Sequence, residues 1–176
     1  MFSTKAGGEE LCLAWANTYG VPIMVTHTMN VIGERQHPEK WVPLIVRKTL
    51  REQEITVHAS PDLKRSGSRF YIHARNVADA ILFLLKSGKT REKYNIVGER
   101  EVTNEEMVKY IATILGKQPK YRMVDFHSSR PEHDLRYALD GGRLAEMGWG
   151  VPVQFWASLE RVVRWTIEHP KWLGSP

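Results

Sequence analysis

The side chains of this chain that could do chemistry are mainly cationic and amide groups spread along its length. The formal net charge is +5, and the Lys and Arg residues are scattered among acidic ones. They are densest in DLKRSGSR, residues 62–69. The planar guanidinium fork of arginine can hold two phosphate oxygens at once, and a few arginines suffice for that task. The charge therefore favours an anionic small ligand, such as a diphosphate.

Nucleic-acid binding is the competing explanation of the positive charge. However, no Lys/Arg cluster of the usual kind occurs, and the aromatic residues are not interleaved with arginines at an exposed spacing. We rank this explanation last and expect no nucleic-acid partner. The chain is 42% hydrophobic and 26% charged, which is typical of a soluble globular protein. No apolar run approaches the roughly 20 residues of a membrane span, and no signal peptide is recognisable, so we also expect no membrane partner.

Cysteine and histidine contribute little chemistry to the prediction. Cys12, the one cysteine, is predicted to be a small, buried or half-buried hydrophobic residue of a helix. A chain without an internal disulfide fits a reducing, cytoplasmic setting. His37, His73 and His127 lack the spacing to a carboxylate or thiol that a metal site needs, so we predict no metal site.

The cationic and amide side chains lie on predicted strands and helices that alternate along the chain. This alternation predicts the α/β class. Residues 4–19 predict a helix, and the β-branched run 21–31 predicts a strand buried on both faces of a parallel sheet. Residues 103–116 predict a helix whose N-cap is Thr103, with Glu106 completing a capping box. The other predicted strands are 54–59, 69–74, 93–98 and 120–126, and the other predicted helices are 40–53, 75–88, 141–149 and 155–173.

One expected element of many nucleotide-binding α/β proteins is not in this sequence. Neither Gly-x-Gly-x-x-Gly nor Gly-x-x-Gly-x-x-Gly occurs in it. These 176 residues therefore do not supply the strand–turn–helix that holds the pyrophosphate of a dinucleotide.

Four segments, in order, nevertheless carry a family resemblance. They are STKAGGEEL with TYGVPIMVT, NVIGERQHPEKWVP, SRFYIHARNVADA with YNIVGE, and RPEHDLRYALD with MGWGVP. Each segment is weak alone, but the ordered set is specific. The chain resembles the C-terminal half of extended short-chain dehydrogenase/reductases, within the NAD-dependent nucleotide-sugar epimerases and dehydratases of the dTDP-glucose 4,6-dehydratase kind.

The resemblance implies a fold and a division of the chain. The fold would be a C-terminal substrate-binding lobe with the last strand or strands and helix of an incomplete Rossmann sheet. Residues 1–35, the Lys5 helix and the following strand, would be a remnant of the NAD-binding Rossmann domain. Residues 36–176 would be the nucleotide-sugar-binding domain.

The resemblance also implies a catalytic and cofactor-binding origin for Lys5. Lys5 matches the lysine of a Tyr-x-x-x-Lys motif, and Met1 stands where the tyrosine would be. Residues four apart share a helix face, where the ammonium can favour the phenolate and hydrogen-bond the nicotinamide ribose. Without the phenol Lys5 has nothing to activate, and a solvated first-turn lysine is the alternative. NAD, the cofactor of the intact family enzyme, would then not be bound by this chain alone.

The resemblance assigns several residues to the sugar nucleotide. Arg69 and Arg130 would converge in space on its diphosphate, and His133 would contact the nucleotide. Asn30 and Asn95 would lie against the sugar diphosphate, although both could also be strand-end turn formers. The residues so assigned are Asn30, Glu39, Lys40, Pro43, Arg69, Asn95, Arg130 and His133.

The stretch from Glu39 to Pro43 would open a helix beside the nucleotide, where free N–H groups could meet an anion. A solvated charge pair is the alternative interpretation of Glu39 and Lys40.

Two functions follow from these assignments. The first is the nucleotide-sugar-binding part of an NAD-dependent 4,6-dehydratase or epimerase, a lyase or isomerase, inactive by itself. The second is a free-standing nucleotide-sugar-binding or docking module that pairs with a separate NAD-binding half. The expected partners are a dTDP- or UDP-hexose and either a second copy of the chain or such a half. The apolar face of the helix 4–19 would then be exposed, and a sheet edge unpaired.

Overall fold

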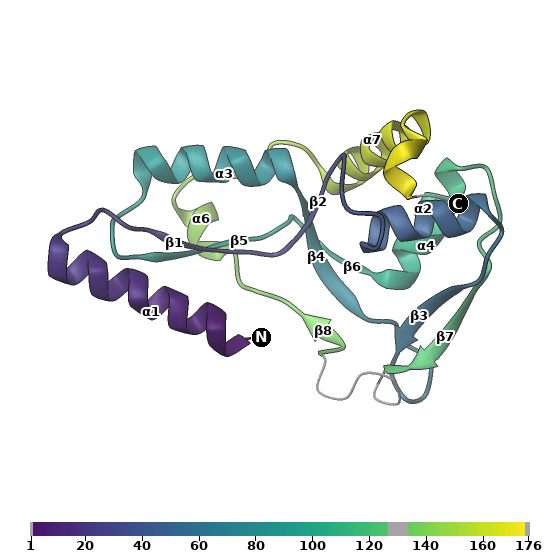
Figure 1. Ribbon diagram of the computed structural model, residues 1–176, viewed down its shortest axis with the longest axis horizontal. Coiled ribbons are helices and arrows are strands. Elements are labelled where there is room, and N and C mark those ends of the chain that lie inside the picture. Colours follow the sequence, from purple (N-terminus) through teal and green to yellow (C-terminus); the bar gives the residue numbers. More distant parts are fainter. Residues whose placement is uncertain (1, 127–133, 175–176) are drawn as a thin grey trace.

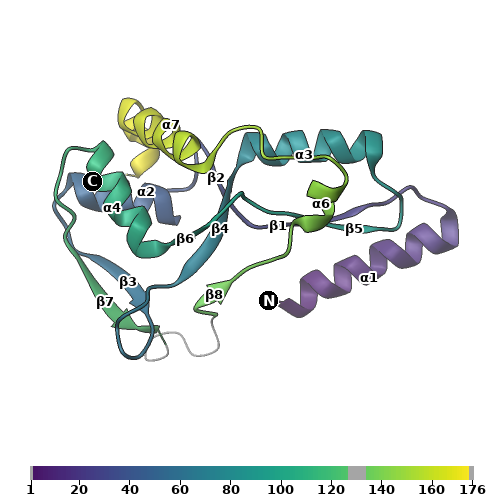
Figure 2. The same ribbon diagram turned by 180° about the vertical axis from the view of Figure 1, so that it is seen from behind.

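A pair of parallel strands lies between two helices in one lobe of the computed structural model, which describes residues 2–126 and 134–174 (Figure 1). Strands β1 (Val25–Thr28) and β5 (Lys93–Ile96) pair in parallel. Helix α1 (Phe2–Tyr19) lies on one side of this pair and α3 (Ala74–Ser87) on the other (Figures 1 and 2). We call this three-layer unit, with the short helix α6 (Gly142–Glu146), the N-terminal lobe.

Helices gather around a second parallel strand pair in the other lobe. Strands β3 (Ile55–Ala59) and β7 (Tyr121–Asp125) pair along their full length. We call this unit, with the helical segments that pack beside the pair, the C-terminal lobe. Its helical segments are α2 (Trp41–Leu50), α4 (Asn104–Ile114), α7 (Phe155–Glu168) and the 3₁₀ turn η1 (Pro170–Leu173).

Strand β4 (Ser68–His73) runs between the lobes and is the centre of a mixed sheet (Figure 1). Strands β2 (Asn30–Ile32) and β8 (Arg136–Tyr137) pair with it in parallel, and β6 (Glu101–Thr103) pairs with it in antiparallel fashion. The sheet therefore brings together residues that are far apart in the sequence, because each partner strand comes from a different segment.

Local sequence signals set several helix ends. Thr103 caps α4: its side chain accepts from the N–H of Glu106, and the Glu106 carboxylate accepts from the N–H of Thr103. This confirms the predicted capping box. His73 caps α3 by accepting from the N–H of Arg75, and Gly88 ends the helix. Strand β4 can therefore pass directly into α3 without a connecting loop.

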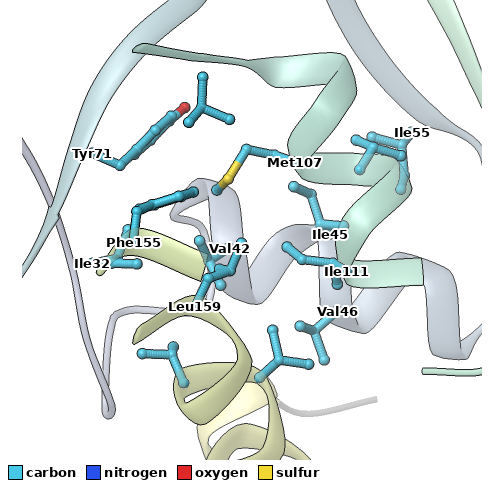
Figure 3. Packing of buried hydrophobic residues seen from close by; sticks show 14 of the residues in the cluster. Ile32, Val42, Ile45, Val46, Ile55, Tyr71, Met107, Ile111, Phe155 and Leu159 are labelled. Atoms are coloured by element: carbon cyan, nitrogen blue, oxygen red, sulfur yellow. The ribbon is translucent and has the colours of Figure 1, made fainter. Parts of the chain in front are cut away.

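The main core lies in the C-terminal lobe and reaches the central sheet (Figure 3). Helix α7 contributes Phe155 and Leu159, which are almost fully buried. The Phe155 ring stacks on Tyr71 of β4, with the ring centroids 5.9 Å apart. Burial of one such side chain contributes about 1.5–3 kcal/mol, so this contact helps to fix the position of β4 on the lobe.

The expected single strand 21–31 is wrong in two respects. The structure has two short strands in different sheets, and Met29, which is 1% exposed, lies between them. Among the described strands, β1 pairs only with β5, so its side chains are half-buried or exposed instead of buried on both faces. The chain changes sheets at Met29, and this change depends on contacts with β4 and β5 that no local pattern encodes.

Helix α1 presents most of its apolar side chains to solvent. Leu11, Trp15 and Tyr19 are exposed, and Ala16 is the buried residue of the helix among those with described burial. Cys12 is exposed, so the prediction of a buried or half-buried cysteine is wrong. The physical reason is that the small Ala16 makes the close contact with the rest of the lobe, which turns its neighbours outward. The sequence does not predict strand β6, because three residues are too few to show the alternation of apolar and polar side chains that marks a strand.

Candidate functional site

Arg69 of β4 is the centre of the candidate site. Its Nη1 donates to the carbonyls of Ser68 (2.6 Å) and Leu135 (2.8 Å), and its Nη2 donates to the carbonyl of Asp134 (2.8 Å). The guanidinium carbon also lies 6.0 Å from the ring centroid of Tyr137. An arginine has five N–H donors, so Nε and one Nη2 proton of Arg69 have no hydrogen-bond acceptor among the described residues. Arg69 therefore fixes the chain at 134–135 and keeps donors for a ligand.

A second arginine holds the same segment from the opposite face of β4. Arg136 of β8 makes a bidentate pair with Glu101 of β6, at 2.9 Å from Nε to Oε1 and 2.9 Å from Nη2 to Oε2. Ser68 donates a further hydrogen bond to Glu101. The hydrogen bonds from Arg136, and then from Ser68, hold the pKa of Glu101 below its ordinary value of 4.5. The carboxylate is thus kept charged, and β8 stays attached to the sheet.

Asn104, at the start of α4, is an amide that the sequence reasoning missed. The hydroxyl of Tyr71 donates to Asn104 Oδ1 at 2.8 Å, which leaves Nδ2 to point elsewhere. Burial raises the pKa of Tyr71, so its phenol stays protonated and can donate. The sequence did offer a signal for Asn104, because it directly follows the predicted N-cap Thr103. The first turn of a helix has unpaired N–H groups, so a polar side chain at this place can contribute to an anion-binding site.

A glycine makes room between Arg69 and Asn104. A Cβ placed on Gly67 would lie 3.1 Å from the carbonyl oxygen of Leu135 and 3.2 Å from Asn104 Nδ2. The backbone carbonyl of Gly67 also accepts from the N–H of Asn104 at 2.7 Å. The glycine thus lets three chain segments approach closely where donors from Arg69 and Asn104 gather.

Asn30 lies on the same face of the sheet. It is exposed and faces Tyr71 in the register between β2 and β4. Side chains along a strand alternate between faces, so Arg69 shares a face with Tyr71 and hence with Asn30. The structure therefore brings together Asn30, Arg69 and the newly recognised Asn104.

Three other assigned residues lie at or just before the start of α2. Glu39 and Lys40 are exposed before α2, and Lys40 occupies the N-cap without a side-chain cap. Pro43 is buried in the first turn of α2, where it contributes to packing. Its pyrrolidine ring suits the first turn of a helix, where the N–H would have no helical partner. An anion could thus reach the helix start beside Lys40, but not the buried ring of Pro43.

Asn95 is used within the N-terminal lobe. Its Nδ2 donates to the carbonyl of Asp140 at 2.8 Å, and its Oδ1 lies 3.3 Å from Nδ1 of His27. Nε2 of His27 in turn meets Glu9 of α1 at 2.7 Å, and Lys93 meets the same carboxylate at 3.1 Å. The hydrogen bonds from Lys93, and then from His27, lower the pKa of Glu9. Asn95 is thus part of the link between α1 and the β1–β5 pair.

Lys5 is exposed on α1. Arg130 and His133 lie outside the described residues, whose second range begins at Asp134. The convergence of Arg69 and Arg130 therefore stays a prediction, although the neighbouring carbonyl of Asp134 lies at Arg69.

The described residues do not build a complete dinucleotide site. Lys5 alone is positioned on the helix that would face the nicotinamide ribose, and no glycine-rich turn accompanies it. In the part of the chain that the structure describes, no group of three His, Cys, Asp or Glu residues could hold a metal ion. Within the same residues, no helix has the length and apolarity to cross a bilayer.

Comparisons with known proteins agree with this architecture. A family model described as NAD dependent epimerase/dehydratase family matches residues 2–97. The chain is 30% identical over 179 residues to a dTDP-glucose 4,6-dehydratase of Salmonella typhimurium, an alignment that covers 98% of this chain and 48% of that protein. It is 31% identical over 173 residues to the trifunctional UDP-glucose 4,6-dehydratase/UDP-4-keto-6-deoxy-D-glucose 3,5-epimerase/UDP-4-keto-L-rhamnose-reductase of Arabidopsis thaliana, over 98% of this chain and 25% of that protein.

A solved structure shows the same fold. The dTDP-glucose 4,6-dehydratase of Streptomyces venezuelae, determined with NAD bound, matches with a TM-score of 0.84 and 33% identity over 98% of this chain and 52% of that chain. The chain thus spans between a quarter and about half of the length of these relatives. The α/β fold with parallel strands is that of the short-chain dehydrogenase/reductases, as predicted. The chain belongs to the NAD-dependent epimerase/dehydratase family of extended short-chain dehydrogenase/reductases.

Proposed function

We propose that this chain is the nucleotide-sugar-binding part of an NAD-dependent 4,6-dehydratase or epimerase, and that it binds a dTDP- or UDP-hexose without converting it. The observation that carries the proposal is the donor cluster on one face of the central sheet. Arg69, Asn104 and Asn30 gather there beside the chain at 134–135. Relatives named for dTDP-glucose and UDP-glucose chemistry are 30% and 31% identical to this chain over 98% of its length.

Each group would have a role that fits its chemistry. The free donors of Arg69 would hold the diphosphate, because a guanidinium makes charge-assisted hydrogen bonds to phosphate oxygens. Asn104 Nδ2, oriented by Tyr71, would donate to a phosphate oxygen or a sugar hydroxyl. Asn30 would do the same from the exposed end of β2. Together these residues would bind and orient the substrate, while bond-making steps would fall to other parts of an intact enzyme.

Calorimetry with dTDP and UDP tests the binding site. We expect wild-type chain to bind at least one of them, and Arg69→Ala to bind it about 10–100-fold more weakly, because lost hydrogen bonds to a charged group cost about 1.5–3 kcal/mol each. Arg122→Ala is the matched control, because Arg122 is an exposed arginine of β7 that pairs with Glu54 at 2.8 Å. No heat from the wild type, or equal affinities of wild type and Arg69→Ala, would refute the site.

Catalysis by the family enzymes would need a Tyr-x-x-x-Lys pair, which Arg69, Asn104 and Asn30 do not supply. The residue four positions before Lys5 is Met1, so no Tyr-x-x-x-Lys pair forms within the sequence. We expect no 4-keto sugar when the chain is incubated with NAD and dTDP-glucose. Turnover above a no-protein control would contradict this part of the proposal.

The edge of β1 and the faces of α1 and α3 favour a second role, docking to an NAD-binding half. β1 has one paired edge among the described strands, and α1 exposes Leu11 and Trp15. An unpaired parallel edge between two apolar helix faces is the surface on which a Rossmann sheet could continue. We propose the division into residues 1–35 and 36–176 on this basis, with β5 and α3 returning from the second range to complete the N-terminal lobe.

Mixing the chain with a separately produced NAD-binding half of a relative tests docking. We expect a complex on size-exclusion chromatography that Trp15→Glu weakens, because the substitution puts a charge on the exposed helix face. Arg122→Glu, a charge change in the C-terminal lobe, should leave the complex intact. Self-association of the chain alone, also lost in Trp15→Glu, would instead assign the face to a second copy.

A further inference from the structure

Three arginines and one carboxylate line a cleft where three segments of the chain meet. Arg35 follows β2, Arg75 lies in the first turn of α3, and Arg161 lies on α7. Nε of Arg161 is 3.1 Å from Oε1 of Glu34, and Nη2 of Arg75 is 3.7 Å from the same oxygen. With Trp165, these four residues line a cleft of about 410 Å³. A cleft of this size can hold a small molecule.

The charges of this arginine cleft are not balanced. Glu34 is the one acidic residue among those that line it, against three guanidinium groups. Its other carboxylate oxygen, Oε2, meets Nε2 of the buried His73 at 3.1 Å. Both carboxylate oxygens of Glu34 therefore have partners, and its Oε1 holds the guanidinium groups of Arg75 and Arg161 near each other.

The guanidinium groups keep donors for a further anion. Arg161 uses Nε for Glu34, which leaves its Nη groups, and the side chains of Arg75 and Arg161 are 60% and 56% exposed. Arg35 is exposed and has no ion-pair partner among the residues that the structure describes. Guanidinium groups in this state can bind phosphate oxygens in a bidentate manner.

The arginine cleft lies away from Arg69. His73, which meets Glu34, is four residues along β4 from Arg69, a separation of about 13 Å in an extended strand. Figures 1 and 2 show α7 and the start of α3 on the upper side of the molecule, whereas β8 lies toward the lower side. A ligand of the arginine cleft would therefore not compete for the donors of Arg69.

Trp165, which lines the arginine cleft, indicates what kind of ligand the cleft could bind. The Trp165 ring stacks on His169, with centroids 4.2 Å apart and an interplanar angle of 10°, so its plane is fixed. A fixed indole beside cationic groups suits a flat ring attached to a phosphate. We propose that the arginine cleft binds a small phosphorylated molecule, with the phosphate on Arg35, Arg75 and Arg161 and a ring against Trp165. This site is independent of the proposed sugar-nucleotide site.

Calorimetry with inorganic pyrophosphate tests the arginines, and ADP tests the added ring. Arg35→Asn is the main variant, because Arg35 has a φ of 64° and asparagine tolerates this left-handed conformation. We expect it to bind pyrophosphate at least about tenfold more weakly than wild type, the loss of one charge-assisted hydrogen bond. Arg161→Gln should also weaken binding. Arg164→Gln is the matched control, because Arg164 lies on the same helix and pairs with Glu160 instead.

The outcomes separate this proposal from its alternatives. Loss in Arg35→Asn and Arg161→Gln, with wild-type affinity in Arg164→Gln, supports the arginine cleft. Absence of binding by the wild type, wild-type affinity in Arg35→Asn, or loss only in Arg69→Ala overturns it. Circular dichroism establishes that each variant is folded, and the exposed Arg35→Asn decides the matter if Arg161→Gln does not fold. ADP binding no tighter than pyrophosphate overturns the role of Trp165.

Discussion

Arg69 shows at the residue scale how one side chain can serve the fold and a ligand at once. Three hydrogen bonds to carbonyls of Ser68, Asp134 and Leu135 fix its guanidinium. An arginine held in this way loses little further freedom when an anion binds, which favours affinity. Lysine has no planar fork, so Arg69→Lys would keep the charge and lose the clamp.

Two glycines give a matched prediction about close contacts. A Cβ on Gly98 would lie 2.0 Å from the backbone oxygen of Tyr71, whereas a Cβ on Gly7 of α1 would meet nothing within 4 Å. Gly98→Ala must move backbone, so we expect it to destabilise the protein by more than about 3 kcal/mol. Gly7→Ala should stabilise it by about 0.5–1 kcal/mol, because alanine favours the helix.

Urea denaturation of both glycine variants measures these free energies of unfolding. A Gly98→Ala protein as stable as wild type would show that the approach of Gly98 to β4 is not as close as described.

Glu101 gives a prediction about pH. Its pKa is lowered in the folded protein by the hydrogen bonds from Arg136 and Ser68, so the carboxylate stabilises the fold above its ordinary pKa of 4.5. That stability is lost as the pH falls through the lower, folded-state pKa. We expect Glu101→Gln to be less stable than wild type at pH 7 and to approach it in stability below about pH 4.

Urea titrations at several pH values check this dependence. A stability difference between wild type and Glu101→Gln that stays constant from neutral to acid pH would count against a charged role of Glu101.

Helix α4 shows at the scale of elements how a local signal positions a functional side chain. The capping box at Thr103 sets the first residue of the helix, and that residue is Asn104. Because Thr103 is also the last residue of β6, the cap joins strand to helix directly. The amide of Asn104 thereby meets Tyr71 of the neighbouring strand.

Removing this cap should weaken both the fold and the site. We expect Thr103→Ala to lower the free energy of unfolding by about 0.5–2 kcal/mol, the usual cost of a lost N-cap. Thr103→Ser, which keeps the hydroxyl, is the matched control. Chemical denaturation compares the two variants, and equal losses would mean that the hydroxyl is not the source of the stability.

The mixed sheet holds the two lobes together at the scale of the whole molecule. Strand β4 contributes Tyr71 to the core of the C-terminal lobe and Ile72 to the core of the N-terminal lobe. Alternation along the strand sends these neighbours to opposite faces, so one strand serves both cores. The proposed sugar-nucleotide site lies on this shared element.

A ligand at that site should therefore stabilise the whole molecule. At a dTDP concentration 100 times its Kd, we expect the free energy of unfolding to rise by about 2.7 kcal/mol, because the ligand binds only the folded chain. Arg69→Ala should show a much smaller rise at the same concentration, and Arg122→Ala the full rise. Thermal melting with and without dTDP measures the effect, and an unchanged melting temperature of the wild type would exclude binding at that concentration.

The sequence by itself determined the α/β class, most helices and strands, the capping box of α4 and the family. These features are local or depend on ordered segments, so the residues of one stretch suffice to recognise them. The sequence also singled out Arg69 and Asn30 through the family resemblance, and the structure places them on one sheet face.

Only the tertiary structure decided which groups meet. In the structure, residues 21–31 contribute to two different sheets, and Cys12 is exposed. Asn95 takes part in the link between α1 and the β1–β5 pair, and Asn104 lies beside Gly67. The tertiary structure also brought together the arginine cleft from three distant segments. The physical reason is that such contacts join residues tens of positions apart, and their free energy depends on how whole elements pack, which no local pattern of residues encodes.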